Sequence, residues 1–240
     1  MKSKSEMLIE EAEKLRKLVG RLVFSLPVTH VYNPLEYAWE SHRLYLSLYG
    51  NSEKRVIFLG MNPGPWGMAQ TGVPFGEIQA VKKFLKIEAP VEKPLNENPK
   101  RPVTGFQCTR SEVSGRRFWG FFEEKYGKAS KFFSDHFVGN YCPLVFMESG
   151  GRNVTPDKLK ASESKELYNI CDMHLKRVVE ILKPEWVIGV GRFTEKCAQR
   201  ALNGMEVKIG HIMHPSPASP AANNDWAGSV SRQLNEMGLY

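Results

Sequence analysis

Residues 56–77 have the sequence VIFLGMNPGPWGMAQTGVPFGE, in which a short apolar run opens into a loop rich in glycine and proline. The continuous run Val56–Leu59 is typical of a buried strand. The glycines let the loop backbone approach a ligand closely, and the prolines hold it stiff. Asn62 and Phe75 are the amide and the aromatic ring that the loop can present. The stretch therefore predicts a rigid pocket for a flat polar ring such as a nucleobase.

Composition and charge set the broad class of the protein. The chain has 240 residues, of which 42% are hydrophobic, and this suits one α/β domain with a sizeable core. No apolar run comes near the roughly 20 residues of a membrane span, and residues 1–6 lead into helical periodicity without a signal-peptide core. We therefore expect an intracellular protein, cytoplasmic if bacterial or nuclear if eukaryotic, and a monomer. The net charge of +7 mildly favours a polyanionic partner.

The four cysteines, Cys108, Cys142, Cys171 and Cys197, include no C-x-x-C pair and lie in unlike contexts. This favours four reduced, mostly buried thiols. An iron–sulfur cluster is the alternative, and the absence of closely spaced pairs counts against it.

Strand-like and helix-like segments alternate along the chain. Apolar runs predict four strands, at residues 54–59, 137–142, 186–190 and 207–213, and helical spacing predicts helices at residues 5–24, 35–48, 77–85, 114–126, 162–182, 194–202 and 223–237. Residues 90–105 are expected to be a long connection and residues 150–156 a loop. The alternation implies a three-layer α/β/α fold with a central, mainly parallel four-stranded sheet. We expect residues 1–240 to form one domain, with an N-terminal helix within residues 1–28.

In such sheets ligands bind beyond the carboxyl ends of the strands. Four candidates follow predicted strand ends: Asn62, Asn140, His214 and the turn Gly189–Arg192. The turn lacks the third glycine of a dinucleotide motif, and no Walker loop, zinc motif or serine-nucleophile elbow occurs in the chain. The convergence of these residues predicts one active-site cleft at this edge of the sheet.

Each candidate also has a purely structural interpretation. His214 precedes three prolines within six residues, so it could donate a hydrogen bond to an anion that forms in a transition state or simply cap a strand. Asn62 could stabilise a turn, and Phe75 could belong to the core. Asn140 lies in an apolar strand, where an unpaired amide costs about 1–3 kcal/mol. Its partner is therefore either internal or a ligand, and an amide suits the mixed donor and acceptor edge of uracil.

The candidates belong to a larger set of recognisable runs. The runs are Gly60–Glu77, His214–Pro217, Tyr32–Ala38, Ser111–Gly115, Arg117–Phe121, Asn140 with Cys142–Leu144, and Gly151–Asn153. Together they resemble the single-strand-selective monofunctional uracil-DNA glycosylase family of the uracil-DNA glycosylase superfamily. Only the first helix, to about residue 28, lacks a clear match.

The resemblance implies an enzyme that flips a uracil nucleotide out of DNA and hydrolyses its N-glycosidic bond. Phe75 would stack on the base, and Asn140 would bond N3–H and O4, which rejects cytosine. Asn62 would position the attacking water, and His214 would stabilise the departing uracil anion. The backbone of Gly60 and Met61 would shape the pocket near C5 and admit 5-hydroxymethyluracil, and Gly64 is a further candidate for base binding.

The resemblance also implies how DNA is held. The loop Pro215–Ala222, with Pro215, Ser216, Pro217, Ala218 and Ser219 at its start, would act as a wedge in the duplex. Ala218 stands where an arginine is common in the family, and Gly139 stands where some members have a histidine. Arg152 is a candidate DNA contact beside a matched run.

Neither catalytic run contains a lysine, so we expect no Schiff base, no strand cleavage and an abasic product. The resemblance implies no metal ion and no cofactor. The alternatives are a superfamily glycosylase that prefers deaminated purines such as hypoxanthine or xanthine, a catalytically silent binder of damaged DNA, and a nucleotide-binding enzyme of small molecules.

Overall fold

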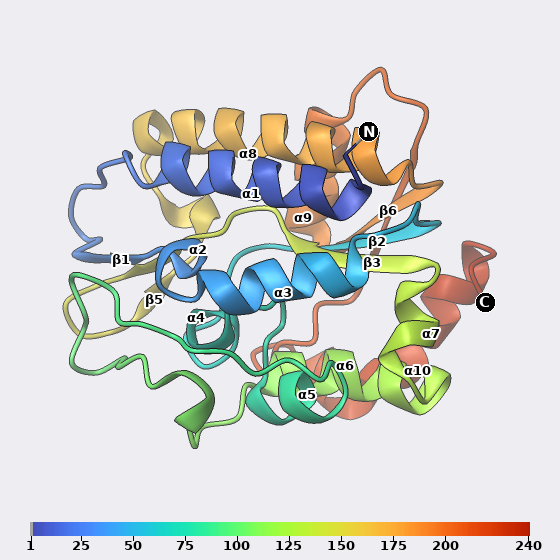
Figure 1. The fold of residues 1–240 in the computed structure, drawn as a ribbon, viewed down its shortest axis with the longest axis horizontal. Coiled ribbons are helices and arrows are strands. Elements are labelled where there is room, and N and C mark those ends of the chain that lie inside the picture. The colour runs from blue at the N-terminus through green and yellow to red at the C-terminus, as the bar shows by residue number, and fades with distance from the viewer. Residues whose placement is uncertain (1) are drawn as a thin grey trace.

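The computed structural model describes residues 2–240 as helices layered on a central sheet (Figure 1). The sheet has four strands in the order β3 (His136–Asn140), β2 (Val56–Gly60), β6 (Trp186–Val190) and β7 (Lys208–Ile212). All three pairings are parallel. The predicted α/β/α fold with a mainly parallel four-stranded sheet is confirmed, and each of the four predicted strands agrees to within about two residues.

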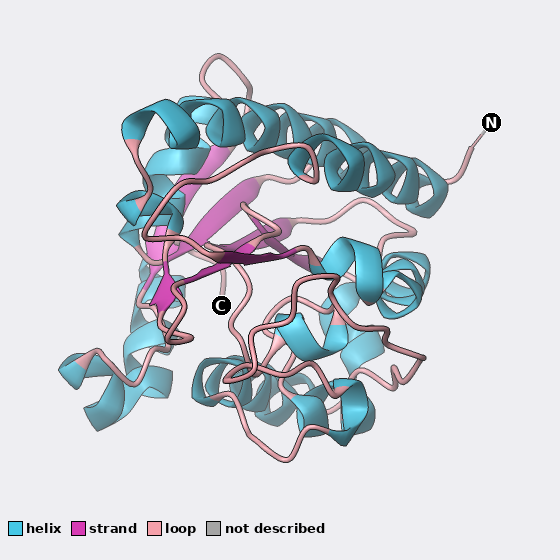
Figure 2. Cartoon of the chain, turned by 90° about the vertical axis from the view of Figure 1, so that its left-hand side faces the viewer, coloured by secondary structure: helices cyan, strands magenta, loops and turns pink. Residues whose placement is uncertain are grey.

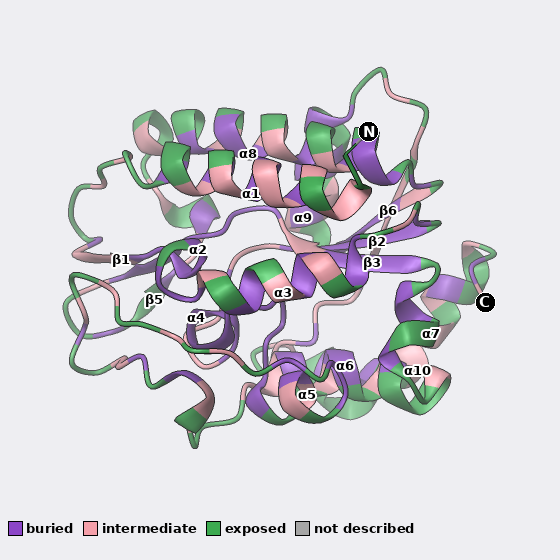
Figure 3. Cartoon of the chain, in the orientation of Figure 1, coloured by how far each residue is buried: buried purple, intermediate pink, exposed green. Residues whose placement is uncertain are grey.

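Helices cover both faces of this sheet. One layer contains α1 (Lys4–Val19), α8 (Ala161–Leu182) and α9 (Arg192–Ala201), and the other contains α5 (Ile78–Lys83), α6 (Val113–Tyr126) and α10 (Pro220–Glu236). All five residues of β2 are buried, as expected for a strand covered on both sides (Figure 3). Phe58 of β2 packs against Phe118 and Phe122 of α6, so aromatic rings join the sheet to its lower layer.

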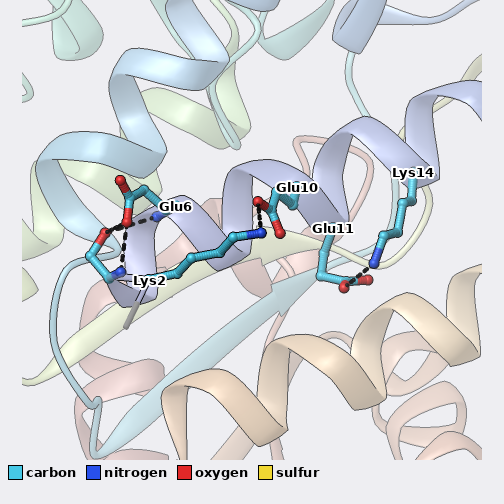
Figure 4. Close-up of polar contacts among 6 residues, drawn as sticks. Lys2, Glu6, Glu10, Glu11 and Lys14 are labelled. Atoms are coloured by element: carbon cyan, nitrogen blue, oxygen red, sulfur yellow. Dashed lines mark hydrogen bonds and ion pairs between the residues drawn. The ribbon is translucent and has the colours of Figure 1, made fainter.

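The first helix is shorter than its periodicity predicts. It begins with a capping box between Ser3 and Glu6, and Lys2 pairs with Glu10 and Lys14 with Glu11 along its surface (Figure 4). It ends at Val19 rather than near residue 24. The carbonyl of Arg16 accepts the N–H of Gly20 at 3.1 Å and also the side-chain amide of Asn33 at 3.2 Å, so a tertiary contact adds to the last helical bond.

A second, three-stranded antiparallel sheet was not predicted. It consists of β1 (His30–Tyr32), β4 (Val145–Met147) and β5 (Asn153–Val154), in the order β1–β4–β5 (Figure 2). Strands of two or three residues are too short to show a period in the sequence. The loop expected at residues 150–156 therefore contains a strand.

The remaining elements are short. They are α2 (Pro34–Tyr37), α3 (Trp39–Tyr49), α4 (Met68–Thr71), α7 (Ala129–Phe133) and the 3-10 turns η1 (Gly105–Gln107) and η2 (Pro156–Lys158). The connection expected at residues 90–105 has no helix or strand before η1. In residues 2–240, no helix combines the length and the apolar character needed to span a membrane.

Candidate active site

The predicted catalytic and base-binding residues lie around the carboxyl edge of the four-stranded sheet. Gly60, the last residue of β2, lies directly opposite Asn140, the last residue of β3. The pairing continues past the strands, because the N–H of Cys142 donates to the carbonyl of Met61 at 2.9 Å. His214 reaches the same edge two residues beyond β7 and lies against Gly191 at the end of β6. The parallel topology thus gathers residues that are far apart in sequence.

Gly60, Phe75 and Asn140 form a compact group. A Cβ atom on Gly60 would overlap the Asn140 side-chain oxygen and come within 2.9 Å of the Phe75 ring. Only glycine fits there. Phe75 has a φ of +52°, a conformation that is strained for a residue with a side chain. Its ring stacks on Phe118 with centroids 4.3 Å apart and planes 8° apart. Phe75 is therefore packed on one side by the core and is 8% exposed.

The side chain of Asn140 is only weakly satisfied by the protein. In the described part of the chain its one hydrogen bond runs from Nδ2 to the sulfur of Met68 at 3.1 Å. A thioether is a weak acceptor. The side-chain oxygen, which lies beside Gly60, accepts from no group of residues 2–240. An amide in this position is available to a ligand that offers both a donor and an acceptor.

Asn62 is fixed by the segment that follows β3. Its Nδ2 donates to the carbonyl of Leu144 at 3.1 Å. This bond engages the amino group, so the amide oxygen remains free to accept a hydrogen bond. An uncharged oxygen held this way can orient a water molecule and is a poor proton acceptor.

His214 is held as a neutral imidazole of known tautomer. The backbone N–H of Ser216 donates to Nδ1 at 3.1 Å, so the proton of the neutral ring resides on Nε2. Burial lowers the pKa of His214 to about 4. The ring is therefore uncharged at neutral pH and presents an N–H donor.

The loop after His214 is tied down at its base and open at its tip. Arg117 of α6 donates to the carbonyl of Pro215 at 3.1 Å and to the side chain of Asn223 at 2.8 Å. Asn223 in turn donates to the carbonyl of Pro217 at 2.8 Å. Pro217 and Ala218, at the tip of the loop, are exposed. Arg152 lies elsewhere, exposed on the turn before β5 and paired with Glu148.

The sequence interpretation missed Glu112. Its carboxyl group lies against the backbone of the 60–77 loop, where a Cβ atom on Gly64 or Gly67 would overlap it. Burial, together with the nearby carboxylate of Glu77, raises the pKa of Glu112 to about 7. Its membership of the run Ser111–Gly115 was the only signal, and that run gave no role. The carboxyl group of Glu112 thus explains why position 64 is a glycine.

All four cysteines are free thiols, and three of them are buried. Among residues 2–240, no three histidine, cysteine, aspartate or glutamate side chains gather closely enough to hold a metal ion.

Comparison with known proteins places this arrangement in a family. Residues 48–233 match the model of the uracil DNA glycosylase superfamily. The single-strand selective monofunctional uracil DNA glycosylases of Mus musculus and Bos taurus are each 48% identical over 240 residues, 99% of this chain and 86% and 88% of theirs. The fold is similar to the crystal structure of Pedobacter heparinus SMUG2, with a TM-score of 0.67, 15% identity and coverage of 95% of this chain and 97% of that one. The chain belongs to the single-strand selective monofunctional uracil-DNA glycosylase family, within the uracil-DNA glycosylase superfamily.

Proposed function

We propose that this protein hydrolyses the N-glycosidic bond of uracil in DNA and leaves an abasic site. The proposal rests on family membership and above all on one observation, the hydrogen bond from the Ser216 N–H to Nδ1 of His214. That bond fixes a neutral imidazole with its N–H donor at the sheet edge where a base would enter. Such a donor stabilises negative charge that develops on a leaving group.

Base recognition follows from Asn140 and Phe75. Uracil presents a donor at N3 and an acceptor at O4, and Asn140 offers the complementary oxygen and amino group. The amino group gives up only a weak contact with the Met68 sulfur when it turns to O4. Cytosine presents the opposite pattern and would leave buried polar groups unpaired. The free energy of that loss disfavours cytosine relative to uracil. The stack of Phe75 on Phe118 sets the plane in which the base lies.

The chemical step separates charge before water attacks. The bond between C1′ and N1 breaks, its electron pair stays on uracil, and Nε2–H of His214 bonds the O2 of the resulting anion. Asn62 holds a water molecule at C1′ through its free oxygen, and this water adds to the cationic sugar and loses its proton to solvent. A weak acceptor suffices because the sugar is already cationic when water adds.

The two loops that carry Asn62 and His214 offer no amine that could form a covalent intermediate. Residues 60–77 and 214–220 contain no lysine. The reaction therefore stops at the abasic site without cutting the strand.

The substrate range includes single- and double-stranded DNA, and 5-hydroxymethyluracil besides uracil. The exposed loop at Pro217 and Ala218 supplies a wedge for duplex substrates. Gly60, which lies against Asn140 and Phe75, leaves no side chain of its own in the pocket, and this supports room for a substituent at C5 of the base. Activity on duplex DNA and activity on 5-hydroxymethyluracil both depend on the loops rather than on the reacting groups.

A single-turnover assay tests the proposal. A uracil-containing oligonucleotide, single-stranded and then paired, is incubated with excess protein and treated with mild alkali. We expect strand breaks only after alkali. Breaks without alkali, in a preparation free of nuclease, would reveal a lyase step. Matched oligonucleotides that carry hypoxanthine or xanthine in place of uracil complete the test. Release of either purine without release of uracil would support a glycosylase of deaminated purines, and binding without release would support a silent binder of damaged DNA.

A further inference from the structure

A basic groove lies beside the 60–77 loop, outside the pocket described above. It has a volume of about 600 Å³ and is formed by Trp66 on one side and residues 99–110 on the other. Its cationic side chains are Lys100, Arg101 and Arg110. No aspartate or glutamate in the described chain lines it. The groove is therefore positively charged along its length.

These three cations are not neutralised by the protein. In residues 2–240 none of them forms an ion pair, whereas Arg152 is paired with Glu148. Arg101 donates to the carbonyl of Lys100 at 3.2 Å, and its Nε is buried without a hydrogen-bond partner. An unpaired buried guanidinium nitrogen is costly unless a ligand compensates it. The guanidinium groups of Arg101 and Arg110 lie 5.2 and 4.4 Å from the centre of the Trp66 ring. The indole holds both cations in place by cation–π contact.

Buried polar side chains fix the two walls of the groove relative to each other. Gln70 is fully buried and donates to the carbonyls of Pro65 and Pro102, both at 3.0 Å, while its oxygen accepts from the N–H of Thr104 at 2.9 Å. Tyr32 of β1 donates to the carbonyl of Arg101 at 2.9 Å. The groove is thus preformed, and the unpredicted small sheet contributes to it.

The position of the groove suits a strand that leaves the active site. Trp66 follows Asn62 by four residues in the same loop, so the two are at most about 14 Å apart. A DNA strand covers that distance within a few nucleotides of the flipped one. Phosphates are the polyanion that guanidinium groups bind best, because the planar fork matches two phosphate oxygens.

We propose that this groove binds the sugar–phosphate backbone of the uracil-containing strand on one side of the flipped nucleotide, with Lys100, Arg101 and Arg110 as the phosphate contacts and Trp66 as the residue that orients the two arginines. The inference rests on the proposed function for the identity of the strand. It assigns phosphate contacts that the charge of the chain alone could not locate.

The first test is the salt dependence of binding. A labelled single-stranded oligonucleotide without uracil is titrated with the full-length protein at several salt concentrations. Arg101→Gln and Arg110→Gln should each lower the slope of log affinity against log salt by about 0.7 and weaken binding by roughly threefold to tenfold. Trp66→Phe should bind nearly as the original protein does, and Trp66→Ala should bind more weakly. Lys176→Ala, which removes an exposed charge from α8, is the matched control and should leave the slope unchanged.

The second test locates the strand. Uracil oligonucleotides are shortened to one nucleotide on either the 5′ or the 3′ side of the uracil, and single-turnover excision is followed with protein in excess over DNA but at concentrations that do not saturate binding. Shortening the DNA on one side of the uracil should slow excision by the original protein. The same shortening should have little further effect on excision by Arg101→Gln. Equal slopes for the Arg101, Arg110 and Lys176 variants, or equal effects of shortening in all proteins, would overturn the proposal. Because the first test uses DNA without uracil, its result is independent of whether the protein excises uracil.

Discussion

The two functional loops are held in different ways. The 60–77 loop is packed into the protein, with Gln70 and Thr71 fully buried and Phe75 stacked on Phe118. The loop after His214 has exposed residues at its tip and depends on polar contacts from Arg117 and Asn223. The difference indicates that the proposed base pocket is preformed, while the proposed wedge keeps room to adjust to DNA. Substitutions in the two loops should therefore change different properties of the protein.

The largest effects are expected at the reacting groups of both loops. Asn62→Ala and His214→Ala should each reduce the single-turnover rate on a uracil oligonucleotide by about 10²–10³-fold or more, because each removes a contact that matters mainly in the transition state. Binding of the same DNA, measured by fluorescence anisotropy, should change far less. If either variant kept the original rate, the role assigned to that residue would be wrong.

A selectivity change is expected in the packed pocket. Asn140→Asp replaces the amino group by an oxygen and should relax the preference for uracil over cytosine, because the protonated carboxyl can present the pattern that cytosine requires. Excision from matched uracil and cytosine oligonucleotides gives the ratio. Asn140→Ala is the control, since it should lose uracil excision without gaining cytosine excision. Unchanged selectivity in Asn140→Asp would remove this residue from base recognition.

A smaller effect is expected at the base of the wedge. Arg117→Ala should slow excision by roughly 5- to 50-fold on duplex DNA and less on single strands, because the carbonyl of Pro215 loses a charged hydrogen-bond donor worth about 1–3 kcal/mol. Asn223→Ala removes the second link without removing a charge. If Arg117 positions the loop, the two substitutions combined should cost less than the sum of their separate effects. Full additivity would instead indicate a direct phosphate contact by Arg117.

The last effect is on stability and its pH dependence rather than on the rate of excision. The pKa of Glu112 is about 7 in the folded protein, above the ordinary value of 4.5. In the pH range between these values the folded state binds more protons than the unfolded state, so stability falls as pH rises from about 4.5 to 7 and levels off above. Glu112→Gln should remove a pH-dependent loss on the order of 1–3 kcal/mol. Thermal melts at pH 5, 6, 7 and 8 should be flatter for the variant, and parallel curves would show that Glu112 does not titrate in this range.

The sequence was sufficient to predict those parts of the structure whose signal is a hydrophobic period or an unusual local composition. The four parallel strands and the edge at which Asn62, Asn140 and His214 meet followed from apolar runs and their ends. The small antiparallel sheet did not, because β5 has two residues and β1 pairs with a strand more than 100 residues away. Glu112 was missed because its importance comes from lying on the backbone of Gly64 and Gly67, and only the folded chain brings these residues together.

The first two turns of α6, with the N-cap residue Glu112, connect the two loops compared above. At the start of α6, Glu112 lies on the 60–77 loop, Arg117 bonds the loop after His214, Phe118 supports Phe75, and Trp119 donates to the carbonyl of Pro74 at 3.2 Å. The base pocket and the wedge are therefore not separable modules. A designer who transplants either loop into another member of the superfamily will have to carry residues 112–119 along with it, or lose the alignment of both.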